Sequence, residues 1–211
     1  MFEQIMHYFS TNSEQYLQYL WEHLRISFMA IVIAIFIGVP LGYISSRNAK
    51  VAEFFTSTSQ FLRIIPSLAV LFILIPLIGT GIVPALIALV FLAVPPIIIN
   101  TILGFHEISS VVKEVALSMG MNHSEMLFRI EYPLALPYIL NGIKLSLVEI
   151  IASATLATYI GAGGLGTLIF TGLGLYRLDL LVIGGGTVTL LSLLSMFLFD
   201  WMIERVAKND R

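Results

Sequence analysis

Few residues of this chain have the types and spacing that catalysis or metal binding requires. The four histidines form no H-E-x-x-H pattern, and no G-x-S-x-G turn is present to expose a nucleophilic serine. The chain contains no cysteine, which excludes disulfides and thiolate metal or redox sites. We therefore expect no catalytic residue, no metal site and no cofactor, and an enzyme is the weaker functional alternative.

A glycine-rich segment, residues 161–166, reads G-A-G-G-L-G and matches the G-x-G-x-x-G turn that binds dinucleotides. That turn requires a preceding strand within a βαβ unit, whereas a long apolar stretch of helical length precedes this segment. No Lys-Ser or Lys-Thr pair follows the glycines, so we expect no phosphate loop and no ATP hydrolysis by this chain. Two interpretations stay open, a flexible loop or close backbone approach at a gate formed by Gly161, Gly163, Gly164 and Gly166.

The composition is that of a membrane protein. Of the 211 residues, 58% are hydrophobic and 11% are charged, whereas about a quarter of a soluble chain is charged. The mean hydropathy is +0.94. The length predicts one transmembrane domain over residues 1–211, and the net charge of -2 without a basic run excludes nucleic acid as a partner.

Uncharged runs predict an all-α fold with five transmembrane helices of roughly 20 residues each. The expected spans are residues 26–46, about 54–78, a third ending at 105, about 138–160 and about 180–199. The first 24 residues contain no Lys or Arg, so they lack the positive start of a cleaved signal peptide and the first span is expected to be retained.

The distribution of Lys and Arg predicts an outer N-terminus and an inner C-terminus, because these residues resist translocation. One side would collect eight of them: Arg47, Lys50, Arg63, Lys113, Arg129, Arg205, Lys208 and Arg211.

The polar segment around residues 106–137 would then lie on the cytoplasmic side. Within it, residues 109–119 have the apolar spacing of a helix, and Gly120 would end that helix in a left-handed conformation. Asn122 and Glu125 match a capping box that starts a second short helix, which Pro133 is expected to stop. Periodicity alone also allows an amphipathic pair of helices that rests on lipid headgroups.

The same segment carries a signature. Glu114, Ala116, Gly120, Ile130 and Pro133 reproduce the spacing E-A-A, three residues, G, nine residues, I-x-L-P. In this respect the chain resembles the permease subunits of bacterial ABC importers, although Val115 and Tyr132 replace the usual alanine and leucine.

The resemblance implies a type I importer permease core in the bacterial cytoplasmic membrane. It also implies that residues 122–130 form a coupling helix that docks on a cytoplasmic ATPase subunit. The further partners implied are a second permease subunit, the same or a related chain, and an extracytoplasmic substrate-binding protein.

Two further strings, R-I-I-P-S-L-A at residues 63–69 and G-L-G-L-Y at 172–176, join the glycine segment in resembling one branch of these importers. That branch imports osmoprotectants such as glycine betaine, carnitine and choline. The alternative within the family is a methionine or other amino-acid importer permease. An autonomous channel or secondary transporter is the alternative outside it, and an odd span count without an evident inverted repeat argues against that class.

Residues of the translocation path are expected at breaks and charges within the spans. Pro66 removes a backbone hydrogen bond that lipid cannot replace, so Pro66 and Ser67 are candidates for a gate. Glu149 would lie near the middle of the fourth span, where a carboxylate costs about 3 kcal/mol. It could offer a cationic substrate a transient counter-charge, or it could make a structural hydrogen bond or ion pair. The resemblance would place the glycine segment at the outer gate.

Overall fold

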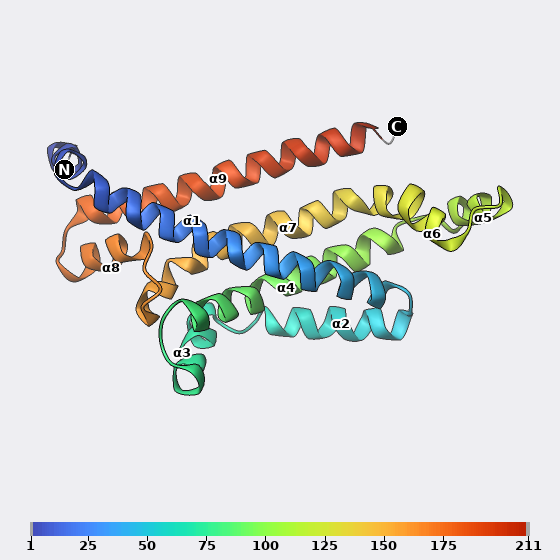
Figure 1. Ribbon diagram of the computed structural model, residues 1–211, viewed down its shortest axis with the longest axis horizontal. Helices are drawn as coiled ribbons and strands as arrows, with labels where there is room; N and C mark the ends of the chain where they lie inside the picture. The colour runs from blue at the N-terminus through green and yellow to red at the C-terminus, as the bar shows by residue number, and fades with distance from the viewer. Residues whose placement is uncertain (1, 210–211) are drawn as a thin grey trace. The chain divides into compact units, whose positions relative to one another are not determined.

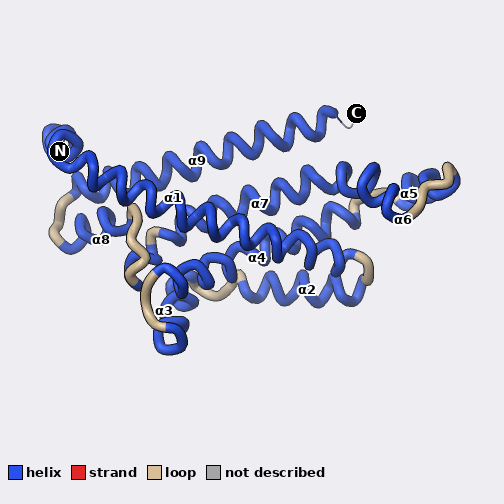
Figure 2. The backbone as a smooth tube through the Cα atoms, viewed as in Figure 1, coloured by secondary structure: helices blue, strands red, loops and turns tan. Residues whose placement is uncertain are grey.

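Helices make up all of the regular structure in residues 2–209, the part of the chain that the computed structural model describes (Figures 1 and 2). The all-α prediction is therefore confirmed. The helices are α1 (Phe2–Ser46), α2 (Ala49–Leu62), α3 (Ser67–Ile78), α4 (Ile82–His106), α5 (Ser110–Ser118), α6 (His123–Met126), a π-helical turn (Leu127–Glu131), α7 (Tyr132–Ala154), a 3-10 helix (Leu156–Ile160), α8 (Gly166–Gly174) and α9 (Leu178–Asn209).

Four helical stretches are long and apolar enough to cross a membrane: Phe2–Ser46, Ile82–His106, His123–Ala154 and Leu178–Lys208. The expected second span is not one straight helix, because α2 and α3 meet at a 90° bend. The bend coincides with Pro66, the N-cap of α3, whose ring disfavours helical conformation in the residue before it. If α2 and α3 together form one broken span, the count reaches five.

Several predicted boundaries were wrong because a charged residue ends an apolar run without ending a helix. The first helix starts at Phe2, not near residue 26, with non-helical backbone angles only at Asn12. The helix expected at 138–160 starts at Tyr132 and ends at Ala154, and the last helix continues to Asn209. Polar residues such as Gln and Glu are good helix formers, so hydropathy alone underestimates these helices.

The chain forms two compact units. The first contains residues 2–33, 65–93 and 147–195, and the second contains residues 34–64, 94–146 and 196–209. Four helices, α1, α4, α7 and α9, contribute residues to both units.

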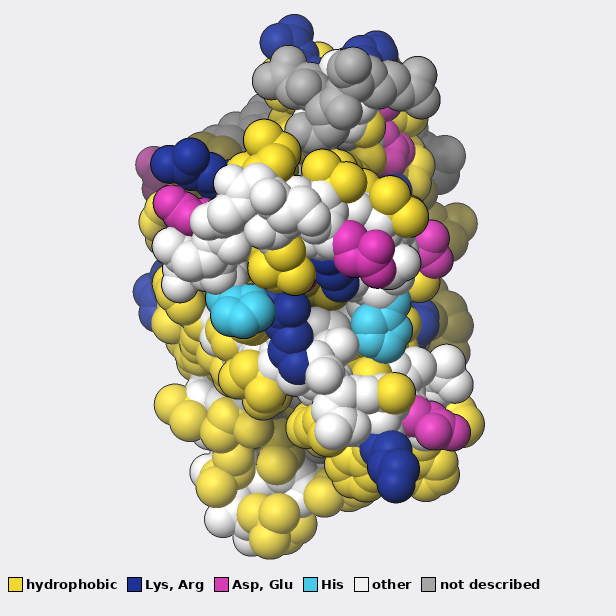
Figure 3. Space-filling view, turned by 90° about the vertical axis from the view of Figure 1, so that its right-hand side faces the viewer, with side chains coloured by type: hydrophobic (Ala, Val, Ile, Leu, Met, Phe, Trp, Pro, Cys, Tyr) yellow, Lys and Arg dark blue, Asp and Glu magenta, His cyan; other side chains and the backbone are white. Residues whose placement is uncertain are grey.

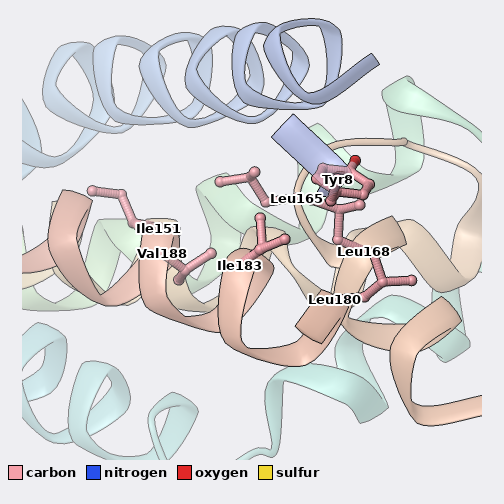
Figure 4. Close-up of a cluster of buried hydrophobic side chains, with 7 residues drawn as sticks. All are labelled: Tyr8, Ile151, Leu165, Leu168, Leu180, Ile183 and Val188. Atoms are coloured by element: carbon pink, nitrogen blue, oxygen red, sulfur yellow. The ribbon is translucent and has the colours of Figure 1, made fainter. Parts of the chain in front are cut away.

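An apolar cluster forms the core of the first unit. Its buried members come from α1, α7, α9 and the segment around the start of α8 (Figure 4): Tyr8, Ile151, Leu165, Leu168, Leu180, Ile183 and Val188. This packing explains why the N-terminal part of α1 is ordered despite its polar sequence, since Tyr8 is only 5% exposed.

Close helix packing through glycine organises the second unit. A Cβ on Gly42 of α1 would lie 2.6 Å from Thr101 Cβ of α4, and one on Gly38 would lie 2.8 Å from a methyl carbon of Ile97. A Cβ on Gly104 of α4 would lie 2.8 Å from Tyr138 Cβ of α7. Small residues at such contacts let transmembrane backbones approach closely. These contacts hold together the end of α4 and the start of α7, between which the polar segment lies.

Candidate functional site

The polar segment between α4 and α7 begins with the short helix α5. Ser109 caps it by accepting a hydrogen bond from the Val111 N–H at 3.3 Å. At its other end Gly120 has φ +84, and the Met121 N–H donates to the Ala116 carbonyl at 3.2 Å. This pattern is a Schellman motif, which requires a left-handed residue after the helix. The predicted helix and the predicted conformation of Gly120 are both confirmed.

The second short helix starts with the capping box expected from the sequence. The Glu125 N–H donates to Asn122 Oδ1 at 2.9 Å, and the Asn122 N–H donates to Glu125 Oε2 at 3.0 Å. Both bonds satisfy backbone donors that the first turn of a helix leaves without partners. This prediction is also confirmed.

The prediction that Pro133 stops this helix was wrong. The chain passes from α6 into the π-helical turn and continues directly into α7, with Pro133 in the first turn of α7. In the π-helical turn the Tyr132 N–H donates to the Leu127 carbonyl, five residues earlier. The wider turn changes the hydrogen-bond pattern immediately before the proline, which has no N–H of its own to donate.

The loop presents a mixed surface. Four apolar side chains of α5 and the turns after it are more than half exposed: Val111, Val115, Met119 and Phe128. The face seen from the right-hand side of Figure 1, where α5 and α6 are labelled, combines Lys and Arg, Asp and Glu, and His side chains with hydrophobic ones (Figure 3). Of the signature residues, Glu114 and Gly120 are exposed, Ile130 and Pro133 are half-buried, and Ala116 is buried.

Sequence reasoning missed Glu131, whose side chain is fully buried at the end of the π-helical turn. Arg47, in the turn between α1 and α2, forms an ion pair with it, and Lys113 Nζ of α5 lies 3.7 Å from its Oε1. The available signal was an acidic residue between two apolar ones, Ile130 and Tyr132, next to a capped helix start. Its partners were not predictable, since Arg47 is 84 positions away.

The glycine segment lies in the first unit, against α1. Glu22 Oε2 accepts a hydrogen bond from the Gly164 N–H at 2.9 Å, while Gln18 Nε2 donates to Glu22 Oε1 at 2.9 Å. Gly163 has φ +74, and a Cβ there would overlap the Glu22 carboxylate. Of the two interpretations left open, the geometry therefore favours close backbone approach.

Two more of the predicted glycines pack closely or line a cavity. A Cβ on Gly166 would overlap the Thr155 carbonyl oxygen. Gly161 and Gly163 line a cavity of about 250 Å³ together with Glu22, Arg25, Ile26 and Met29 of α1. Glu22 is the second residue that sequence reasoning missed, because nothing near it in the sequence marks it as a partner for a loop 142 positions away.

The remaining path candidates are not part of this cavity. Pro66 and Ser67 lie at the start of α3, beside the bend that separates it from α2. Glu149 is half-buried on α7. Lys144 of the same helix pairs with Asp200, with Nζ and Oδ1 2.7 Å apart.

Comparison with known proteins identifies the family. Residues 19–208 match the family described as the inner membrane component of binding-protein-dependent transport systems. The chain belongs to this family. This permease is similar to the carnitine transport permease protein OpuCB of Listeria monocytogenes, with 42% identity over 92% of this chain and 88% of that protein. It is 40% identical to the glycine betaine/carnitine/choline transport system permease protein OpuCB of Bacillus subtilis, over 90% of this chain and 88% of that one.

The fold of the permease is shared with solved ABC transporters. A chain of the MetNI methionine ABC transporter, in inward-facing conformations, superposes with a TM-score of 0.80 over 90% of this permease and 95% of that chain. At 23% identity this likeness concerns the fold alone. It gives the permease the fold of a type I ABC importer subunit and places it in the inner membrane, where the family acts.

Proposed function

We propose that this permease imports quaternary-amine osmoprotectants: glycine betaine, carnitine and choline. The observation that carries the proposal is its 42% and 40% identity, over nine-tenths of the chain, to permeases named for these substrates. The methionine alternative rests on a likeness of fold at 23% identity, which two importers of different substrates can share.

Substrate uptake tests this proposal. Cells with and without the chain are given labelled glycine betaine, choline, carnitine and methionine, in separate assays at equal concentration. We expect uptake of at least one quaternary amine to depend on the chain and methionine uptake to be unchanged. Dependence of methionine uptake alone would overturn the proposal in favour of the amino-acid alternative.

We infer that the permease works in a complex of two permease subunits, two cytoplasmic ATPase subunits and a substrate-binding protein outside the membrane. The family name supports the binding protein. Five helices enclose too little space for an alternating-access path, which supports a second permease subunit. ATP hydrolysis is then the task of the ATPase subunits, and copurification of an ATPase with the tagged permease tests this assembly.

We propose that the segment of about residues 106–137 is the coupling loop, with Glu114, Ala116, Gly120, Asn122, Glu125, Ile130 and Pro133 in that role. Its exposed apolar side chains and its two defined turns support a docking element of fixed shape. We propose that Gly161, Gly163, Gly164 and Gly166 form the outer gate, with Pro66, Ser67 and Glu149 on the translocation path.

We propose one transmembrane domain with five spans, an outer N-terminus and an inner C-terminus. Four helices that contribute to both compact units support a single domain. Because the chain has no cysteine, Ser124→Cys and Leu175→Cys, at two exposed positions, can each be probed with an impermeant maleimide. We expect labelling of position 175 from outside and of position 124 only after permeabilisation. The reverse pattern would invert the orientation.

A further inference from the structure

Glu131 stands at x in the I-x-L-P end of the signature, the one position there at which the signature specifies no residue. Its carboxylate is fully buried, whereas the Arg47 side chain is 42% exposed and the Lys113 side chain 33% exposed. A buried carboxylate requires charged or hydrogen-bonding partners, because its desolvation is otherwise strongly unfavourable. The cluster of Arg47, Lys113 and Glu131 provides them from three separate segments of the second unit.

Arg47 holds Glu131 in a defined orientation. Its two terminal nitrogens donate to the two carboxylate oxygens, with Nη1 3.2 Å from Oε1 and Nη2 bonded to Oε2. Such a two-pronged arrangement fixes direction as well as distance, which a lysine cannot do. The turn that carries Arg47 joins α1 to α2, so this pair connects the start of α7 directly to those helices.

Arg47 is itself held by aromatic side chains. Its Nη2 donates to the Tyr43 hydroxyl at 2.8 Å, and its guanidinium carbon lies 4.6 Å from the centre of the Tyr43 ring. The Tyr43 ring packs on Phe105 near the end of α4, with ring centres 5.0 Å apart. Near the same place, His106 Nε2 of α4 donates to the Ser46 carbonyl at the end of α1, at 3.1 Å. Arg47 is therefore restrained by Tyr43 as well as by Glu131.

We propose that Glu131 is a positioning residue that transmits movement of the coupling loop to α1 and α2 through Arg47. This inference rests on the proposed function of the loop. Lys113 connects α5 to the same carboxylate, so that α5 and the start of α7 are linked by a side-chain contact as well as by the backbone between them.

The test uses the permease in its complex with the ATPase and the binding protein, reconstituted in liposomes. For each variant, glycine betaine uptake and ATP hydrolysis are measured together, and their ratio is compared with the wild type. Glu131→Gln removes the charge and keeps the volume. We expect it to retain the ATPase and to hydrolyse ATP, but to transport at least tenfold less substrate per ATP.

Two further variants separate positioning from a purely structural role. Arg47→Lys keeps a positive charge but cannot make the two-pronged bond to Glu131, and we expect it to lower the transport per ATP while membrane abundance and ATP hydrolysis are retained. Asp200→Asn breaks a separate ion pair of the second unit, Lys144 with Asp200, and serves as the control, for which we expect wild-type coupling.

A wild-type ratio in Glu131→Gln, or in an Arg47→Lys variant that assembles and hydrolyses ATP, would overturn the proposal. If Glu131→Gln does not accumulate in the membrane, Arg47→Lys alone decides by the same ratio. A wild-type permease that fails to retain the ATPase would count against the proposed function itself. That outcome is distinct, because it precedes any comparison of variants.

Discussion

Replacing Gly120 tests whether the shape of the coupling loop depends on backbone conformation or on side-chain volume. Gly120 has φ +84, and a Cβ there would meet no atom within 4 Å, so the cost of a substitution lies in the backbone alone. A residue with a Cβ pays about 1–2 kcal/mol for a left-handed conformation, and each 1.4 kcal/mol is a factor of ten in population. Gly120→Ala should therefore lower the population of the native turn by about tenfold.

The comparison with Asn at the same position makes the prediction specific. Asn tolerates left-handed backbone better than other residues with a Cβ, although it is larger than Ala. We expect the loss of substrate uptake and of substrate-stimulated ATP hydrolysis to be similar in the Leu and Ala variants, and the Asn variant to stay close to the wild type. Membrane abundance should stay normal in all three, because the turn lies outside the apolar helices.

Reconstituted complexes with a fixed amount of ATPase provide the assay. If ATP hydrolysis stays fully coupled to uptake in Gly120→Leu, the loop is only an amphipathic segment at the membrane surface. A greater loss in Gly120→Asn than in Gly120→Ala would refute the backbone explanation and would indicate that a docked partner leaves no room for a side chain.

Four further substitutions test other contacts. Asn122→Ala should weaken the start of α6 by about 1 kcal/mol, and amide hydrogen exchange over residues 123–126 should become faster by about fivefold, whereas Asn122→Ser should exchange like the wild type. Gly163→Ala should lower the melting temperature of the purified permease, because Gly163 has φ +74 and the new Cβ would displace the Glu22 carboxylate from its bond to Gly164, and an unchanged melting temperature would contradict this explanation. Glu22→Ala should cost about 1.5–3 kcal/mol of local stability through the lost bond to Gly164, measured as faster exchange of that amide, while Glu22→Gln should retain part of the protection. Gly42→Val should reduce membrane abundance, since its side chain would overlap Thr101, and normal abundance would show that α1 and α4 separate easily.

The local structure of the loop was predictable because its signals are local. The capping box spans residues 122–125, and the helix end is set by one glycine, so neither depends on distant parts of the chain. Fold class and family were predictable for a similar reason, since hydropathy and the loop signature are read directly from the sequence.

Long-range geometry was not predictable from the sequence. The ion pair between Arg47 and Glu131 and the bond from Gly164 to Glu22 join residues 84 and 142 positions apart, and no local pattern links them. The bend between α2 and α3 was missed because hydropathy does not distinguish a broken span from a straight one, although Pro66 marked the place. Pro133 gave the opposite error: it predicted a helix end, whereas the helix continues through the π-helical turn into α7.

The glycine contacts among α1, α4 and α7 restrict how the second unit can move. At Gly38, Gly42 and Gly104 the helices approach so closely that no room is left for one methyl group. Helices packed at this distance cannot slide past one another by small steps without steric overlap, because packed interiors resist gradual deformation. The parts of the three helices that lie in the second unit should therefore move through a transport cycle as one rigid block. Changes of shape within this unit should then be confined to segments that lack such contacts.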